Sequence, residues 1–229
     1  MGHVPSRAEP GPGPTVILYV RHGTTPTTGR VLPGQGGGLH LSDQGRAEAA
    51  RAGERLAALP AGTVSAIYAS SLERAQETAT ALGSALGLPV QTEPDLMDCD
   101  TGEWTGLELK AVRKLPEWRN LELWPSGFRF PGGESTAEVQ SRVTAVTERL
   151  RRAHPGAVVV AVSHADPIKL AVVSALGMPP DLNERVVISP CSITAITYAP
   201  GAVAVLTVNS TADLRGLGLV RHEDGKAKE

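Results

Sequence analysis

Short apolar runs alternate along this chain with longer stretches whose apolar residues recur at the spacing of one helix face. Residues 15–20 (TVILYV) and 157–162 (AVVVAV) have the continuous apolar character of buried strands, and residues 64–69 (VSAIYA) are predicted to form a further strand. The amphipathic stretches predict helices, which follow Ser42, cover about residues 72–86 and follow Ser135. This alternation predicts a three-layer α/β/α sandwich, with a mostly parallel central sheet and helices on both faces.

Polar residues suited to helix ends support this division. Ser135 and Glu138 have the spacing of a capping box at the start of a helix. Asp166 and Pro167 are suited to be the N-cap and a first-turn residue of a further helix, and this helix is predicted to end at Gly177.

The pattern is weaker in two other regions. Residues 87–106 are predicted to be a loop, and residues 107–124 to form one or two short helices. Residues 193–198 and 203–208 are predicted to pair as a hairpin or as edge strands.

The 229 residues suffice for one large α/β domain, and no internal repeat or interior linker divides them. We therefore expect one domain over residues 15–214, with a cap region at about residues 104–133. Residues 1–14, rich in Pro and Gly, and the charged residues 215–229 are predicted to be flexible tails.

Composition excludes some classes of function. The net charge of -2 gives no basic field for a nucleic acid partner, and no run approaches the ~20 apolar residues that span a bilayer. Cys99 and Cys191 match neither a disulfide framework nor a zinc-binding pattern. We expect a cytoplasmic protein that needs no metal or cofactor, and the sequence does not predict its oligomeric state.

Polar groups follow three of the predicted strands. Arg21, His22 and Gly23 follow the first, a segment containing Arg74 follows the second, and His164 follows the third. Ligands of open α/β sheets bind at the carboxyl ends of the strands, so two histidines and two arginines should meet there. Arginine binds phosphate oxygens in a bidentate manner, the helix that follows His164 offers free amides to an anion, and a neutral imidazole is a competent nucleophile. These groups predict a phosphate site.

The chain resembles the histidine phosphatase, or phosphoglycerate-mutase-like, superfamily from about residue 15 to residue 214. RHG alone would be a weak signal, but seven blocks in the family's order are specific. The blocks are LYVRHGTT (18–25), LSDQGRAEA (41–49), SSLERAQETA (70–79), LMDCDTGEWTG (96–106), PGGES (131–135), VSHADPI (162–168) and VNSTADL (208–214).

The resemblance implies a metal-independent hydrolase of small phosphomonoesters. His22 would be phosphorylated and then freed by water, while Arg21, Arg74 and His164 would clamp the phosphate and stabilise its charge. Gly23 would let the backbone approach the ligand closely.

Other positions at the implied substrate site match the family less uniformly. Thr25 matches the family pattern, and Ala165 follows His164 at the site. Thr28 stands where many relatives carry Asn, so it offers a hydroxyl in place of an amide, or no contact. The family's general acid is usually Glu at the position of Asp98, whose reach is shorter by one methylene. Glu103 is the rival candidate, and we rank Asp98 first because an acid must lie within hydrogen-bond reach of the leaving oxygen.

Two alternative functions stay open. Mutases of the superfamily use the same phosphohistidine, but they typically have longer inserts, a Trp-Asn pair after RHG and a double-arginine motif. This chain has Pro-Thr-Thr after RHGTT, and its adjacent pair Arg151 and Arg152 falls late on a predicted helix. A weakly catalytic regulatory member is the second alternative, which the shortened acid keeps open and the two histidines and two arginines disfavour.

Overall fold

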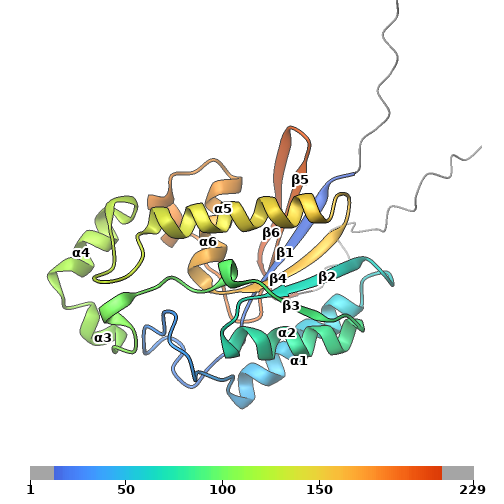
Figure 1. The fold of residues 1–229 in the computed structure, drawn as a ribbon. Helices are drawn as coiled ribbons and strands as arrows, with labels where there is room; N and C mark the ends of the chain where they lie inside the picture. Colours follow the sequence, from blue (N-terminus) through green and yellow to red (C-terminus); the bar gives the residue numbers. More distant parts are fainter. Residues whose placement is uncertain (1–12, 213–229) are drawn as a thin grey trace, which may run out of the picture.

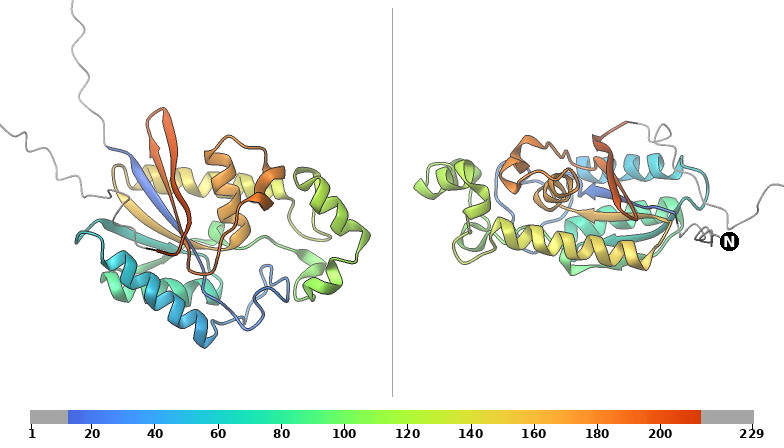
Figure 2. Two further views of the ribbon diagram at one scale, coloured as in Figure 1. Left: turned by 180° about the vertical axis from the view of Figure 1, so that it is seen from behind. Right: turned by 90° about the horizontal axis from the view of Figure 1, so that it is seen from above.

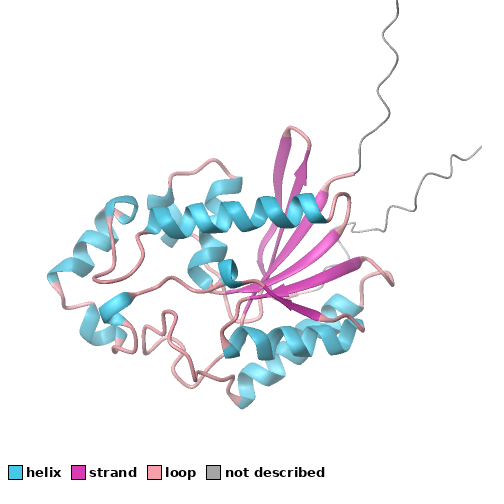
Figure 3. Cartoon of the chain, in the orientation of Figure 1, coloured by secondary structure: helices cyan, strands magenta, loops and turns pink. Residues whose placement is uncertain are grey.

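The computed structural model describes residues 13–212, and its elements follow the predicted alternation (Figures 1 and 3). The strands are β1 (Thr15–Arg21), β2 (Val64–Ala69), β3 (Val90–Thr92), β4 (Val158–Ser163), β5 (Ile193–Ala199) and β6 (Ala202–Ser210). The α-helices are α1 (Asp43–Ala57), α2 (Glu73–Leu86), α3 (Leu109–Val112), α4 (Pro116–Leu123), α5 (Thr136–Ala153) and α6 (Ala165–Ala175). Short 3-10 helices are η1 (Pro94–Leu96), η2 (Gly102–Trp104), η3 (Pro125–Gly127) and η4 (Pro180–Arg185).

The six strands form one sheet in the order β3-β2-β4-β1-β5-β6. Strands β3, β2, β4 and β1 are mutually parallel, whereas β5 runs antiparallel to β1 and forms a hairpin with β6. The predicted, mostly parallel sheet and the predicted hairpin are therefore confirmed. Because β1 and β4 are parallel neighbours, the residues that follow them, His22 and His164, emerge at the same edge of the sheet.

Alternate residues of the central strands point into two separate cores. Val16, Leu18 and Val20 of β1 pack with α1 and α2, whereas Ile17 and Tyr19 pack with α5 and α6. Figures 1 and 2 show these two helix pairs on opposite faces of the sheet. Strands buried on both faces need apolar residues at every position, which explains the unbroken apolar runs and confirms the three-layer sandwich.

The capping residues act largely as predicted. Ser42 accepts a hydrogen bond from the amide of Gly45 at 3.1 Å, and Ser135 and Glu138 form the full capping box. The prediction that Asp166 caps α6 is wrong, because His164 is the N-cap and Asp166 is the second helical residue. A proline in the first turn needs no amide hydrogen bond, so Pro167 allows the helix to begin two residues earlier.

The region between α2 and α5 contains more structure than predicted. Strand β3 and the turns η1 and η2 lie where a loop was expected, and α3 and α4 are the two short helices expected over residues 107–124. Helices α3 and α4 lie beyond the carboxyl ends of the parallel strands (Figure 1). Trp104 is buried in the aromatic cluster that joins this region to the core.

The predicted tails, residues 1–14 and 215–229, fall almost entirely outside the described residues, as does the predicted end of the domain at residue 214. Within residues 13–212, none of the helices combines the length and hydropathy that a bilayer-crossing segment requires.

Candidate active site

His22 is the first residue after β1, and its ring is 4% exposed. Its Nδ1 lies 2.7 Å from the carbonyl oxygen of Gly23. A carbonyl can only accept, so Nδ1 carries the proton and the lone pair is on Nε2. Burial, together with the charges of Arg74 and Arg21, lowers the pKa of His22 from 6.5 to about 3. The imidazole is therefore neutral and nucleophilic at neutral pH.

Two arginines supply positive charge beside this ring. Arg74 is fully buried, and it donates to the carbonyl of Gly34 at 2.8 Å, while Arg21 donates to the carbonyl of Ile188 at 2.7 Å. The Nε atoms of both arginines are buried and have no hydrogen-bond partner among the described residues. Buried donors are normally satisfied, so this pair of cations is suited to an anion that completes their hydrogen bonds.

His164 lies against His22, with ring centroids 5.0 Å apart. Its Nε2 is 2.8 Å from Oγ of Ser70, the residue that follows β2. Its Nδ1 is buried without a hydrogen bond, 3.5 Å from Oδ2 of Asp98. Burial lowers the pKa of His164 well below its ordinary value, so this second ring is also neutral. Three strand ends thus meet at one point.

Asp98 completes this group of side chains. Its Oδ2 lies 3.2 Å from Nη2 of Arg74, and its side chain is 14% exposed. Burial and the charge of Asp166 raise the pKa of Asp98 from 3.8 to about 6, against the opposing influence of Arg74. The carboxyl group can therefore hold or release a proton near neutral pH, as a general acid must.

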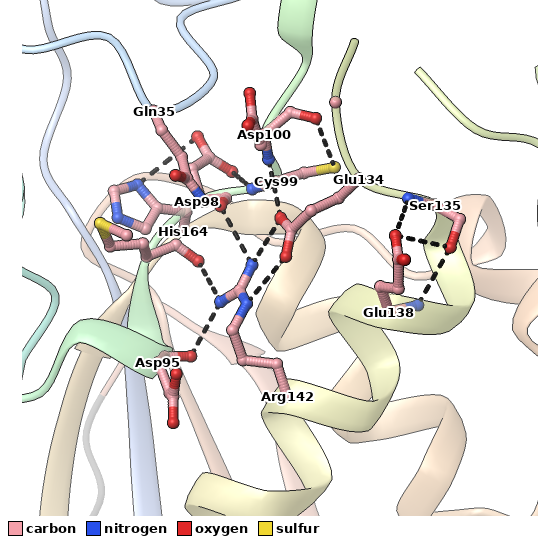
Figure 4. Close-up of polar contacts among 12 residues, drawn as sticks. Gln35, Asp95, Asp98, Cys99, Asp100, Glu134, Ser135, Glu138, Arg142 and His164 are labelled. Atoms are coloured by element: carbon pink, nitrogen blue, oxygen red, sulfur yellow. Dashed lines mark hydrogen bonds and ion pairs between the residues drawn. The ribbon is translucent and has the colours of Figure 1, made fainter. Parts of the chain in front are cut away.

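Arg142 of α5 holds the segment that carries Asp98 (Figure 4). Its guanidinium donates to the carbonyls of Asp95 and Met97 at 2.8 and 2.9 Å, and to that of Asp98 at 3.2 Å. Glu134 accepts two further bonds from the same guanidinium, at 3.0 and 2.9 Å. Three of these five contacts hold the backbone of the segment that ends at Asp98, and the two with Glu134 orient the guanidinium.

A cavity of about 150 Å³ opens between these groups. Six of the residues predicted for the site line it, namely Arg21, His22, Thr25, Thr28, Asp98 and Ala165. Arg74 and His164 are not in the lining, but both touch the lining residue Asp98. Glu103 is exposed on η2 and does not line the cavity, so the geometry favours Asp98 over its rival.

The close approach at Gly23 involves another glycine. A Cβ atom on Gly23 would lie 2.6 Å from the carbonyl oxygen of Gly45 in α1. Gly23 does not line the cavity, so the structure places this contact at the packing of the loop on α1. Thr28 uses its hydroxyl inside the loop, where Oγ1 accepts from the amide of Thr25 at 2.9 Å.

Sequence reasoning missed several residues that hold the site. Ser70 binds His164, Thr78 accepts from the amide of Gly23 at 3.1 Å, and Glu48 binds both the amide and the hydroxyl of Thr24. Each contact joins segments far apart in the chain, so no local sequence pattern predicts it. Within residues 13–212 there is no group of three or more His, Cys, Asp and Glu residues arranged to hold a metal ion.

Comparison with known proteins agrees with this geometry. A protein-family model described as the histidine phosphatase superfamily (branch 1) matches residues 17–211. A bifunctional protein of Mycobacterium tuberculosis is 34% identical over 203 residues, which are 88% of this chain and 55% of that protein. The chain therefore spans little more than half of that relative. A probable phosphoglycerate mutase of Yersinia enterocolitica is 30% identical over 216 residues, 89% of this chain and 95% of the mutase.

Among solved structures, a mycobacterial glucosyl-3-phosphoglycerate phosphatase superposes with a TM-score of 0.77 at 25% identity, covering 86% of this chain and 99% of the phosphatase. Phosphatases and a mutase-like protein are thus both among the relatives. The match of the family model over residues 17–211, together with this structural likeness, shows that the chain belongs to the histidine phosphatase superfamily.

Proposed function

We propose that this protein is a phosphomonoester hydrolase that works through a phosphohistidine on His22. The observation that carries the proposal is the neutral His22 ring, whose Nδ1–H is held by the carbonyl of Gly23 beside the buried Arg74 and the half-buried Arg21. This leaves Nε2 as the nucleophile, and the positive charge that a phosphoryl group requires comes from side chains. The proposal therefore assigns no role to a metal ion.

The first step transfers the phosphoryl group to the protein. Nε2 of His22 bonds to phosphorus, the ester P–O bond breaks, and the departing alkoxide takes the proton of the Asp98 carboxyl group. Arg21 and Arg74 balance the charge on the phosphoryl oxygens. In the second step, water attacks phosphorus, the N–P bond returns its electron pair to Nε2, and Asp98 accepts the proton of the water. The products are the alcohol and inorganic phosphate.

The intermediate provides the test. The wild-type protein, given an excess of chelator and a ³²P-labelled phosphomonoester, should retain label after quenching at alkaline pH, where phosphohistidine survives. His22→Ala should retain none and should lose turnover. His154→Ala is the matched control, because His154 lies at the C-terminal end of α5 beside Tyr68. This variant should keep both the label and the turnover. Normal turnover by His22→Ala would contradict the proposal.

The relative from Yersinia enterocolitica favours one alternative, a mutase that returns the phosphoryl group to a second hydroxyl. Both reactions share the phosphohistidine, so the fate of that group separates them. We expect the label to appear as inorganic phosphate with 3-phosphoglycerate absent. A requirement for phosphoglycerate as acceptor, with isomer as the product, would favour the mutase.

A further inference from the structure

A second cavity, of about 450 Å³, adjoins the cavity that contains His22. Three segments of the chain pass from one cavity to the other. Val31 and Asp98 line the first, and the residues that follow them, Leu32 and Cys99, line the second. Asp166 lines both. A phosphate ester bound at His22 would therefore extend its alcohol portion toward the second cavity.

The walls of this second cavity are mainly apolar. They come from α3 and α4, from the aromatic cluster under them, and from α5 and α6 of the core. The residues are Leu109, Trp118, Leu121, Phe130, Val139 and Leu170. A cavity of this size accommodates a small organic molecule, and contact with these walls removes apolar surface of the ligand from water.

Three of the charged groups in the lining bind one another. Nζ of Lys169 lies 3.2 Å from Oδ1 of Asp166 and 2.8 Å from Oε1 of Glu184. Burial alone would lower the pKa of Lys169, but the two carboxylates raise it overall, so the ammonium stays charged and occupied. The single cation in this group faces two carboxylates, and an incoming carboxylate would meet net negative charge.

The remaining polar groups in the lining are Thr101, Arg113, Glu122, Thr136 and Asn183. Oγ1 of Thr101 is 2.9 Å from Oγ1 of Thr105. Oε1 of Glu122 accepts from Nε1 of Trp118 at 2.7 Å, and the guanidinium of Arg113 lies 5.8 Å from the centroid of the same ring. Asn183 is 8% exposed, and its carboxamide oxygen is buried without a partner among the described residues. This oxygen can accept hydrogen bonds from a ligand. A sugar would place several hydroxyls against walls that are mainly apolar, and each hydroxyl left unpaired costs free energy.

We propose that the second cavity binds the alcohol portion of the substrate, and that this protein selects phosphomonoesters of mainly apolar alcohols. Phosphorylated carboxylic acids and phosphorylated sugars are disfavoured. The inference rests on the proposed function, because it takes the phosphate to be bound at His22. It assigns a role in substrate specificity to Leu121 and the other apolar residues that line the second cavity.

Binding to the His22→Ala variant tests the inference without requiring turnover. Calorimetry with methyl, butyl and hexyl phosphate should show affinity rising about fourfold for each methylene that enters the cavity. Hexyl phosphate should also bind at least tenfold more tightly than 3-phosphoglycerate or glucose 6-phosphate. Equal affinity along the alkyl series, or tighter binding of the acid or the sugar, would overturn the inference.

Helix α4 offers a matched pair of variants. Leu121 lines the cavity, whereas Leu123, two residues later, is 70% exposed and does not line it. In the His22→Ala background, Leu121→Trp should fill the cavity and abolish the gain from methyl to hexyl phosphate, with methyl phosphate unaffected. Leu123→Trp should keep the full gain. An unchanged gain in Leu121→Trp would also overturn the inference.

Turnover by the wild-type protein, in which His22 is intact, separates the phosphatase proposal from the cavity assignment. A binding gradient without any hydrolysis would contradict the phosphatase proposal and leave the cavity assignment standing. Hydrolysis at equal kcat/KM for methyl and hexyl phosphate would leave the phosphatase proposal standing and contradict the cavity assignment.

Discussion

His22 and Asp98 are shifted in opposite directions by the same physical cause. Burial disfavours the charged form of each group, so it lowers the pKa of the imidazole to about 3 and raises that of the carboxyl to about 6. The proposed nucleophile is therefore a neutral imidazole with a free Nε2 throughout the neutral pH range, and the proposed acid titrates just below that range. Two groups whose pKa values are pushed apart in this way suit a division into nucleophile and acid.

The pKa of Asp98 leads to a prediction about pH and leaving group. Only the protonated carboxyl can donate, so kcat for alkyl phosphates should fall as pH rises through about 6. Asp98→Asn should lower that kcat by ~10²–10⁴-fold, and it should largely spare nitrophenyl phosphate, whose leaving group needs no proton. The measurement is kcat from pH 5 to pH 9 with both substrates.

Two comparisons make this result specific. The aryl substrate controls for ionisation of the substrate phosphate, which occurs in the same range. Glu103→Gln should act mildly and equally on both substrates, because Glu103 does not line the cavity. If Glu103→Gln shows the leaving-group pattern and Asp98→Asn does not, their roles must be exchanged.

Arg74 gives a prediction about geometry as well as charge. Its Nη2 reaches both the carbonyl of Gly34 and Oδ2 of Asp98, and its Nε is left for a ligand. A lysine ammonium cannot copy this fork. Loss of one charge-assisted contact, worth about 1.5–3 kcal/mol, should lower kcat/KM of Arg74→Lys roughly ten- to a hundredfold. Thermal unfolding should confirm that the variant folds, and a near-normal rate would place Arg74 away from the phosphate.

At the scale of elements, α5 holds the segment that contains the acid. Arg142→Lys keeps the positive charge beside Glu134 but cannot reach the three carbonyls of residues 95, 97 and 98. We expect kcat for alkyl phosphates to fall about tenfold, a part of the full contribution of a general acid. KM and the rate with nitrophenyl phosphate should change little, because the phosphate site is untouched.

Arg149, about two turns later on α5, is the matched control. It is half-exposed and pairs with Glu93 and Asp95, so Arg149→Lys should leave both rates unchanged. A uniform loss with both substrates in Arg142→Lys would show that the residue stabilises the fold without positioning the acid.

The elements also show what the sequence could and could not predict. Strands β1 and β4 are buried on both faces, so their apolar runs are nearly continuous and easy to recognise, and β2 is interrupted only by the exposed Ser65. Strand β3 has three residues at an edge, one half-buried and two exposed, and carries no such signal. The position of the two histidines and two arginines after the predicted strands is enough to predict that they belong to one site. The contacts of Arg142, whose carbonyl partners lie 44 to 47 residues earlier in the chain, have no local pattern.

At the scale of the whole molecule, the site lies where the three layers meet. Strand β1 leads to His22, β2 to Ser70 and β4 to His164. Helix α5, on one face of the sheet, holds the segment that contains Asp98. Helices α3 and α4 cover only the proposed alcohol cavity. Helix α5 would serve both the chemistry and the choice of substrate, because it holds the Asp98 segment and also lines the proposed alcohol cavity, so only α3 and α4 would act on the choice of substrate alone.

Strand β1 is hydrogen-bonded to a neighbour on each side, and its apolar residues are buried in both cores. Amide protons in such a strand exchange with solvent only when the whole protein unfolds. Those of α4, which has no fully buried residue, should exchange through local opening. Hydrogen–deuterium exchange should therefore label α4 orders of magnitude faster than β1. On gentle heating, discrimination between alcohols should fade while the reactive histidine is still in place, so the protein would become less selective before it becomes inactive.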